Sequence, residues 1–162
     1  MIVRLSKAIL VASIAFFATL VVFGNVTDYG TNLAFVDHVL DMDTLFPDTT
    51  IRYRAIASPA LHRLAYALII AAEAATAVLC WIGAARMLAA LRRDAAAFRD
   101  AKAFAVAGLT VGFLVWQVGF MSIGGEWFGM WMSQQWNGVP SAFRFVATIL
   151  GVLIYVVLPD GD

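Results

Sequence analysis

The chain has 162 residues, of which 62% are hydrophobic and only 14% are charged, and its mean hydropathy is +0.85. A soluble domain has a much smaller apolar share, so this composition predicts an integral membrane protein with one domain, residues 1–162. The formal net charge is zero, which gives no reason to expect a nucleic-acid partner. The one cysteine, Cys80, excludes a disulfide within the chain and is expected to be a small buried hydrophobe.

The first apolar stretch follows a positively charged start that contains Arg4 and Lys7. Such a start is typical of a signal peptide as well as of a first membrane helix. The residues after the stretch do not match a small-x-small cleavage site, so we interpret it as a retained transmembrane helix. Asn25 and Asp28, where this helix ends, can either cap it or line a polar pocket.

The polar segment that follows contains a short helical pattern at residues 32–42. Apolar residues recur there at helical spacing, and aspartates lie on the opposite face. This pattern predicts a short amphipathic helix that lies on the outer membrane surface or on the other helices. Pro47 ends the pattern, and residues 43–50 are expected to be irregular.

Three further apolar runs complete the predicted fold. Ser58 and Pro59 suit the cap and the first position of a second helix. The third helix is expected to stop at Gly124 and Gly125, and Pro140 opens the fourth. The fold class is thus an all-α membrane protein, a four-transmembrane-helix bundle with a short outer amphipathic helix between helices one and two. The expected helices cover about residues 5–26, 59–91, 95–123 and 140–158.

Small residues four positions apart occur in three of the expected helices and mark places where helix backbones can approach in a membrane. The pairs are Ala71 and Ala75, Gly108 and Gly112, and Ala147 and Gly151.

The lysines and arginines indicate how the bundle is oriented. With the N-terminus inside, seven of the eleven basic residues lie on the inner side, most of them between helices two and three. For a protein of a bacterial inner (plasma) membrane, this bias predicts cytoplasmic N- and C-termini, and the lipid bilayer is the chain's expected partner.

Four stretches of the chain resemble a bacterial family of predicted small integral membrane proteins with a domain of unknown function. They are TDYGTNLAFVDHVLDMDTLFP, RAIASPALHRLAYALIIAAEA, GGEWFGMWMSQQWNG and SAFRF. The likeness covers nearly the whole chain. It implies a four-helix inner-membrane protein, and it implies no activity, substrate, cofactor or catalytic residue.

Glu73 is the main candidate for a functional residue within the spans. It lies about ten residues from either edge of its helix, which places it roughly 15 Å deep. A carboxylate there is costly, so it should face the bundle interior and find a partner, with Gln117 and Thr76 as candidates. Glu73 is then either a group that handles protons or cations, or a hydrogen-bonded residue that holds helices together.

His38, Asp41 and His62 lie on the same side of the membrane and could bind a divalent metal ion. Their spacing matches no known metal motif. The two histidines could also ligate a haem, but neither lies within a span. We therefore expect no cofactor.

The loop after the third helix is rich in aromatic residues: Trp127, Phe128, Trp131 and Trp136. They fit an aromatic belt at the membrane surface or a docking surface for another membrane protein. Glu126 and Arg144 are expected to pair at this outer end.

The sequence holds no nucleophile with a base, no phosphate-binding loop and no CxxC motif, so we do not expect an enzyme. The first hypothesis is an accessory or interaction subunit of a larger membrane complex, or of a homo-oligomer. The alternative is a small ion- or proton-coupled transporter or channel that uses Glu73, although few polar residues line the spans. A metal- or haem-linked redox function is the third hypothesis.

Overall fold

The computed structural model describes residues 1–160, and within that range all regular structure is helical. Four segments are long and apolar enough to cross a membrane, which confirms the predicted all-α bundle of four transmembrane helices. The elements are α1 (Ile2–Thr27), α2 (Tyr29–Asp41), η1 (Arg52–Arg54), α3 (Pro59–Ala89), α4 (Ala95–Ala101), α5 (Ala103–Leu114), η2 (Val115–Trp127), η3 (Met130–Met132) and α6 (Val139–Val157).

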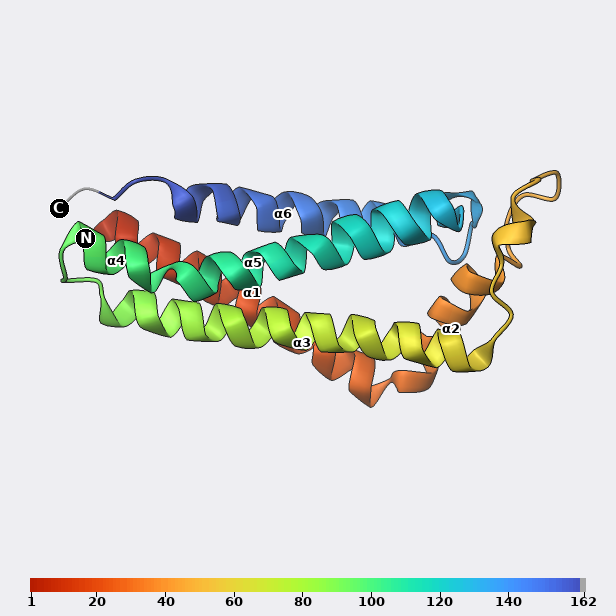
Figure 1. The fold of residues 1–162 in the computed structure, drawn as a ribbon, viewed down its shortest axis with the longest axis horizontal. Helices are drawn as coiled ribbons and strands as arrows, with labels where there is room; N and C mark the ends of the chain where they lie inside the picture. The colour runs from red at the N-terminus through yellow and green to blue at the C-terminus, as the bar shows by residue number, and fades with distance from the viewer. Residues whose placement is uncertain (161–162) are drawn as a thin grey trace.

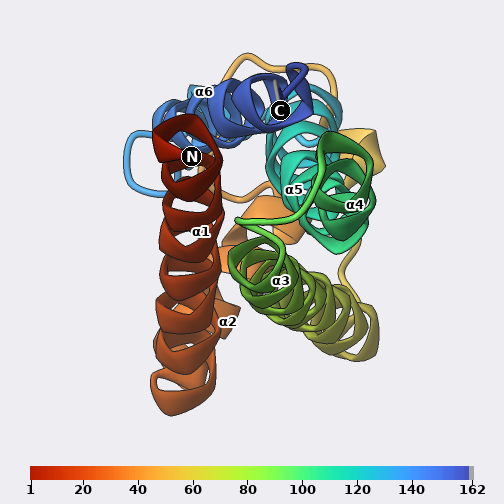
Figure 2. The same ribbon diagram turned by 90° about the vertical axis from the view of Figure 1, so that its left-hand side faces the viewer.

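The four long helical segments run alternately in opposite directions along one axis (Figure 1). Seen end-on, α1 lies beside α3 and α6, and α5 lies between α3 and α6 (Figure 2). The N-terminus and the end of α6 lie together at what we call the terminal end (Figure 1). The helix α2 and the connection from η2 to α6 lie at the opposite end, which we call the distal end.

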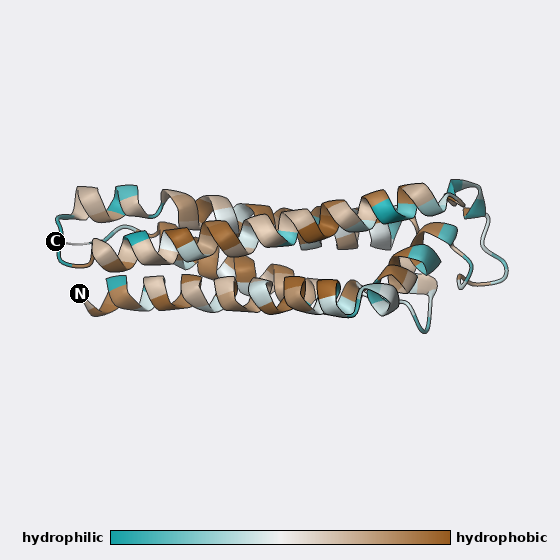
Figure 3. Ribbon diagram, turned by 90° about the horizontal axis from the view of Figure 1, so that it is seen from below, coloured by the Kyte–Doolittle hydropathy of each residue, from teal (hydrophilic) through white to brown (hydrophobic). Residues whose placement is uncertain are grey.

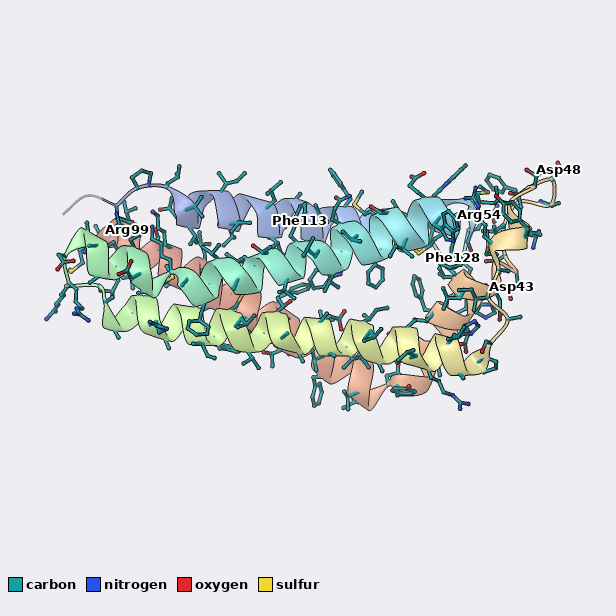
Figure 4. The ribbon with its side chains drawn as sticks, viewed as in Figure 1. Asp43, Asp48, Arg54, Arg99, Phe113 and Phe128 are labelled. Carbon is teal, nitrogen blue, oxygen red and sulfur yellow. The ribbon has the colours of Figure 1, made fainter. Side chains whose placement is uncertain are left out.

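Polar residues gather at the two ends of the bundle, and the stretch between them is mainly apolar (Figure 3). Arg99 lies at the terminal end, whereas Asp43, Asp48 and Arg54 lie at the distal end (Figure 4). This distribution is the one expected for helices that cross a hydrocarbon layer about 30 Å thick.

Glycines allow α3 and α5 to pack with their backbones in close contact. A Cβ atom at Gly83 would lie 2.6 Å from Ala105 Cα, and one at Gly108 would lie 2.7 Å from Cys80 Sγ. A Cβ atom at Gly112 would lie 2.9 Å from the Thr76 side chain. The predicted contact at Gly108 and Gly112 is therefore present, and we call this row of contacts the glycine seam.

The other two small-residue pairs do not form contacts between helices. Ala71, Ala75, Ala147 and Gly151 are all exposed, and a Cβ atom at Gly151 would meet no other atom within 4 Å. The prediction at these positions was wrong, because both pairs lie on helix faces that point away from the bundle.

Two buried lysines and one aspartate close the terminal end. The Lys7 side chain is 0% exposed and donates hydrogen bonds to the Leu158 carbonyl at 2.6 Å and to Asp160 Oδ1 at 2.8 Å. Lys102 forms a second ion pair with Asp160 and donates to the same carbonyl at 3.2 Å. These contacts fasten the segment after α6 to α1 and to the start of α5.

The charge of Asp160 contributes to stability. Burial raises the pKa of the Asp160 carboxyl. The hydrogen bonds from Lys102 and Lys7 and the positive charges of these lysines lower it by more, so that the pKa lies below its usual value. The stabilisation is therefore complete above about pH 4, where an unfolded aspartate is ionised, and is lost as the pH falls through the lowered pKa.

At the distal end, α3 and η2 diverge, and α2 lies beside α1 and α3 (Figure 1). A second hydrophobic cluster joins α2 and the loop after it to the residues that follow η2. It contains Val39, Met42, Leu45, Phe128 and Met130. Residues 43–50 are irregular, as expected.

Two of the differences between the observed and the predicted helix boundaries concern the distal end. The helix α2 begins at Tyr29 rather than at residue 32, since only Asp28 separates it from α1. The third span continues to Trp127 as a π-helix that contains Gly124 and Gly125. Here the glycines leave room for the returning chain instead of ending the helix: a Cβ atom at Gly125 would lie 3.1 Å from the Val139 side chain.

Substitution of Gly108 by leucine should disrupt the glycine seam, because even its Cβ atom would lie 2.8 Å from the Cys80 backbone nitrogen. We expect a loss of about 3 kcal/mol in the free energy of unfolding. The matched control is Gly151→Leu, which adds the same side chain at an open position. Reversible unfolding in mixed detergent micelles measures both variants, and equal stabilities would contradict the packing described above.

Substitution of Asp160 by asparagine should lower the free energy of unfolding at pH 7 by about 3 kcal/mol, because two buried ammonium groups lose their counter-charge. The parent protein should lose stability below about pH 4, whereas the variant should show a flatter profile in this range. Asp48→Asn, in an exposed distal loop, serves as the control. An Asp160→Asn variant as stable as the parent at pH 7 would refute the role of this ion pair.

Candidate functional site

A cavity of about 340 Å³ lies at the distal end, bordered by α1, α2, α3, η2 and α6. We call it the distal chamber. Its volume falls within the range of small-molecule sites, about 300–1,000 Å³. Its polar and aromatic lining residues include Asn25, Asn32, Phe35, Tyr66, Glu73, Trp116, Phe120 and Phe145.

Glu73 is the most buried polar group of the distal chamber. Its side chain is 2% exposed, so it lies inside the bundle as expected. The side-chain amide of Asn25 donates a hydrogen bond of 2.7 Å to Glu73 Oε2. The Tyr66 hydroxyl in turn donates to the backbone carbonyl of Asn25 at 2.9 Å. The three residues thus form one hydrogen-bonded group between α1 and α3.

Helix geometry explains why these three residues meet. Tyr66 and Glu73 are seven residues apart on α3, which is about two turns, so they share one helix face. Asn25 lies in the last turn of α1, which packs along α3. Of the two roles open to Asn25, the structure supports lining a polar pocket.

The partners predicted for Glu73 were wrong. Thr76 is fully buried, but its hydroxyl donates to the Ala72 carbonyl of its own helix at 2.9 Å. Gln117 belongs to η2, which diverges from α3 at this end, and it is not among the residues that line the chamber with Glu73. Depth alone suggested both residues, but the direction of each side chain and the angle between helices decide the contact.

The distal chamber contains one acidic group, Glu73, and its lining includes no basic side chain. Among residues 1–160, Glu73 takes part in no ion pair. Among the residues that line this chamber, the other ionisable side chain is the phenol of Tyr66. A carboxyl group in apolar surroundings is stable as a neutral acid, or as a carboxylate against a cation. The chamber therefore suits the exchange of a proton for a cation.

Aromatic rings form much of the chamber wall. Trp116 and Phe145 pack edge to face with ring centroids 5.5 Å apart, and Phe35 and Phe120 lie 6.3 Å apart. Trp116 is 3% exposed. The negative faces of such rings attract cations, especially where water is scarce. The aromatic wall therefore favours a positively charged ligand, as the carboxylate of Glu73 does.

His62 fastens α2 and the loop before α3 to the start of α3. Its Nδ1 lies 2.9 Å from Asp37 Oδ1, and its Nε2 contacts the Ile56 carbonyl and lies 3.8 Å from Asp41 Oδ1. Both ring nitrogens therefore face oxygen atoms of neighbouring segments. His62 thus helps to hold α2 over the distal chamber.

The grouping of His38, Asp41 and His62 into a metal site is not formed. His38 binds Asp43 at 2.7 Å instead and stacks on Trp136, with ring centroids 4.5 Å apart. Adjacent residues of a helix point about 100° apart, so His38 cannot share the face of Asp37 that meets His62. Within the described residues, no three histidine, cysteine, aspartate or glutamate side chains lie close enough to hold a metal ion.

The aromatic loop divides into buried and exposed parts. Phe128 is 4% exposed and belongs to the distal hydrophobic cluster, whereas Trp127 and Trp131 are 54% and 47% exposed. Trp136 is half-buried. The Arg54 guanidinium lies over the Trp127 ring, 4.8 Å from its centroid. Phe128 is thus a core residue rather than part of an outward-facing surface.

The expected pair of Glu126 and Arg144 is also absent from the ion pairs of residues 1–160. Both residues are exposed, and Arg144 donates to Ser141 Oγ on its own helix at 2.9 Å. Because Ser141 lies three residues before Arg144 on the same helix, this hydrogen bond does not depend on the position of a second helix.

Tyr66 and Trp116 are among the residues of the distal chamber that were not predicted from the sequence. The signal for Tyr66 was available, because it lies on the helix face of Glu73. Trp116 had no comparable signal, since its place in the chamber depends on how η2 is turned.

Comparison with known proteins identifies a family and nothing more specific. The sequence model of the family described as "Predicted small integral membrane protein (DUF2165)" matches residues 3–159. No curated protein and no solved structure shows significant similarity to the chain.

The hydrogen bond between Asn25 and Glu73 should appear as a coupling energy in a double-mutant cycle. Asn25→Leu is expected to destabilise the parent protein more than it destabilises a Glu73→Leu background, by about 1 kcal/mol. Detergent unfolding of the parent, the two single variants and the double variant measures the difference. Additive effects would show that the two residues do not interact.

Proposed function

The chain belongs to the family of predicted small integral membrane proteins, and we propose that it is a non-enzymatic protein whose distal chamber binds a proton or a small cation at Glu73. One observation carries the proposal: a carboxyl that is 2% exposed borders about 340 Å³ of open volume. Its partner in the described chain is the neutral amide of Asn25. A carboxyl that served only to join helices would be expected to lie in filled surroundings.

Binding at Glu73 supports a small ion- or proton-coupled transporter as the wider role. The terminal end is closed by the ion pairs of Asp160 and by the glycine seam, whereas the chamber lies at the distal end. With the basic terminal end in the cytoplasm, as the distribution of lysine and arginine favours, the chamber would take its cation from the outer side. Release of a proton from Glu73 would then accompany uptake of the cation.

Infrared spectroscopy of the purified protein in lipid nanodiscs tests the proposal directly. The chain has two glutamates, Glu73 and Glu126, so single substitutions assign the carboxyl bands. A protonated carboxyl band that responds to pH should be lost in Glu73→Gln and kept in Glu126→Gln. The proposal fails if the parent protein has no pH-dependent carboxyl band that disappears in Glu73→Gln. Glu73 would then have a structural role.

An accessory role in a larger membrane complex is the second candidate function. It is supported by the exposure of Trp127, which lies beside Arg54, and of Trp131, which packs edge to face with Phe46. Exposed tryptophans of this kind anchor contacts between proteins as well as contacts with lipid headgroups. Substitution of both by alanine should leave the infrared response of Glu73 unchanged, because neither lines the chamber.

A further inference from the structure

Next to the distal chamber lies a second cavity that is almost entirely apolar. This cavity, of about 250 Å³, lies between α2, α3 and η2 and shares Phe35, Val36, Ile69 and Phe120 with the chamber. Its lining includes no charged side chain. A ligand that occupied both spaces would therefore meet a carboxyl at one end and hydrocarbon at the other.

The apolar cavity in turn reaches the outside of the bundle. It shares Leu68, Ile69, Gly119 and Ile123 with a depression of about 360 Å³ on the outer faces of α3 and η2. Leu68 is 61% exposed and Ile123 is 48% exposed, as expected for side chains that face lipid. The three spaces adjoin one another between the apolar surface and Glu73, and we call them together the lateral passage.

The passage is open at Gly119, where a Cβ atom would meet no other atom within 4 Å. This opening differs from the glycine seam, in which each glycine is in tight contact with the facing helix. The seam reaches Gly112, and beyond it η2 diverges from α3 (Figure 1). The opening is thus a consequence of the way the two helices separate toward the distal end.

The chemistry of the passage selects one class of ligand. A carboxylate without a cationic partner in the described chain, beside the rings of Trp116 and Phe120, attracts a positively charged head group. The apolar cavity and the lipid-facing depression favour a hydrocarbon tail. An anionic amphiphile would place like charges together, and a neutral one would gain nothing from the carboxylate.

We infer that the ligand of the distal chamber is an amphiphilic amine that enters sideways from the bilayer between α3 and η2, with its ammonium group at Glu73 and its tail in the apolar cavity. This inference rests on the proposed function, because it specifies what Glu73 binds. It adds the class of ligand and the route by which the ligand arrives.

The test uses the full-length protein in nanodiscs of zwitterionic lipid and three probes: octylammonium, methylammonium and octanol. Saturable binding is measured by equilibrium dialysis of the radiolabelled probes, with empty nanodiscs as the reference for partition into lipid. We expect saturable binding of octylammonium alone. Glu73→Gln should weaken it by at least about tenfold, because the ammonium group loses its buried counter-charge.

The route is tested by Gly119→Leu, which adds a side chain to the passage at a site with room for it and away from Glu73. This variant should weaken or slow octylammonium binding while the infrared band of Glu73 still responds to pH. Gly151→Leu, at an equally open glycine of α6, should bind like the parent. Leu68→Trp, on the facing wall, is a second blocking variant if Gly119→Leu does not fold.

Two results would overturn the inference and leave the proposed function in place. Methylammonium could bind as strongly as octylammonium, with no effect of Gly119→Leu or Leu68→Trp, which would indicate entry from the aqueous distal side. Octanol could bind as well as octylammonium, which would indicate that the head group need not be cationic. If the parent protein shows no pH-dependent carboxyl band from Glu73, the proposed function itself is refuted.

Discussion

The hydrogen bond from Asn25 to Glu73 joins two spanning helices at a depth where an unpaired carboxyl is costly. Because Glu73 must face a polar partner, it sets the rotation of α3 about its own axis. The same buried stripe of α3 then carries Tyr66 toward α1 and carries Cys80 and Gly83 toward α5. One polar contact and the close packing of the bundle therefore depend on a single orientation of this helix.

Buried charges are paired at one end of the bundle and unpaired within the described residues at the other. At the terminal end, the buried cations Lys7 and Lys102 share Asp160, so the charges are balanced within the protein. At the distal end, Glu73 has a neutral amide as its partner and an open cavity beside it. The first arrangement stabilises the fold, whereas the second leaves a binding capacity that a proton or a cation can satisfy. This contrast underlies the proposal that the distal end binds a ligand, whereas the terminal end stabilises the fold.

The features that could be predicted from the sequence are those set by composition and by the geometry of one helix. Hydropathy predicts the four spans, and the cost of a buried carboxyl predicts that Glu73 points inward. The partner of Glu73 could not be predicted in this way, because Gln117 and Asn25 are equally plausible until the angle between α3 and η2 is known. Small residues were likewise ambiguous: Gly108 lies in the seam, whereas Gly151 lies on an open face. The distal chamber itself arises from the divergence of two helices, which no single-helix pattern records.

The central claim, that Asn25 holds the Glu73 carboxyl across the helix interface, can be measured directly by solid-state NMR in lipid bilayers. Glutamate labelled with ¹³C at Cδ gives signals from Glu73 and Glu126 alone, because the chain has two glutamates. With asparagine side chains labelled with ¹⁵N, the account predicts strong dipolar coupling for the Glu73 signal, lost in Asn25→Leu, and none for Glu126. Absence of this coupling at Glu73, or its persistence in Asn25→Leu, would contradict the arrangement of the distal chamber.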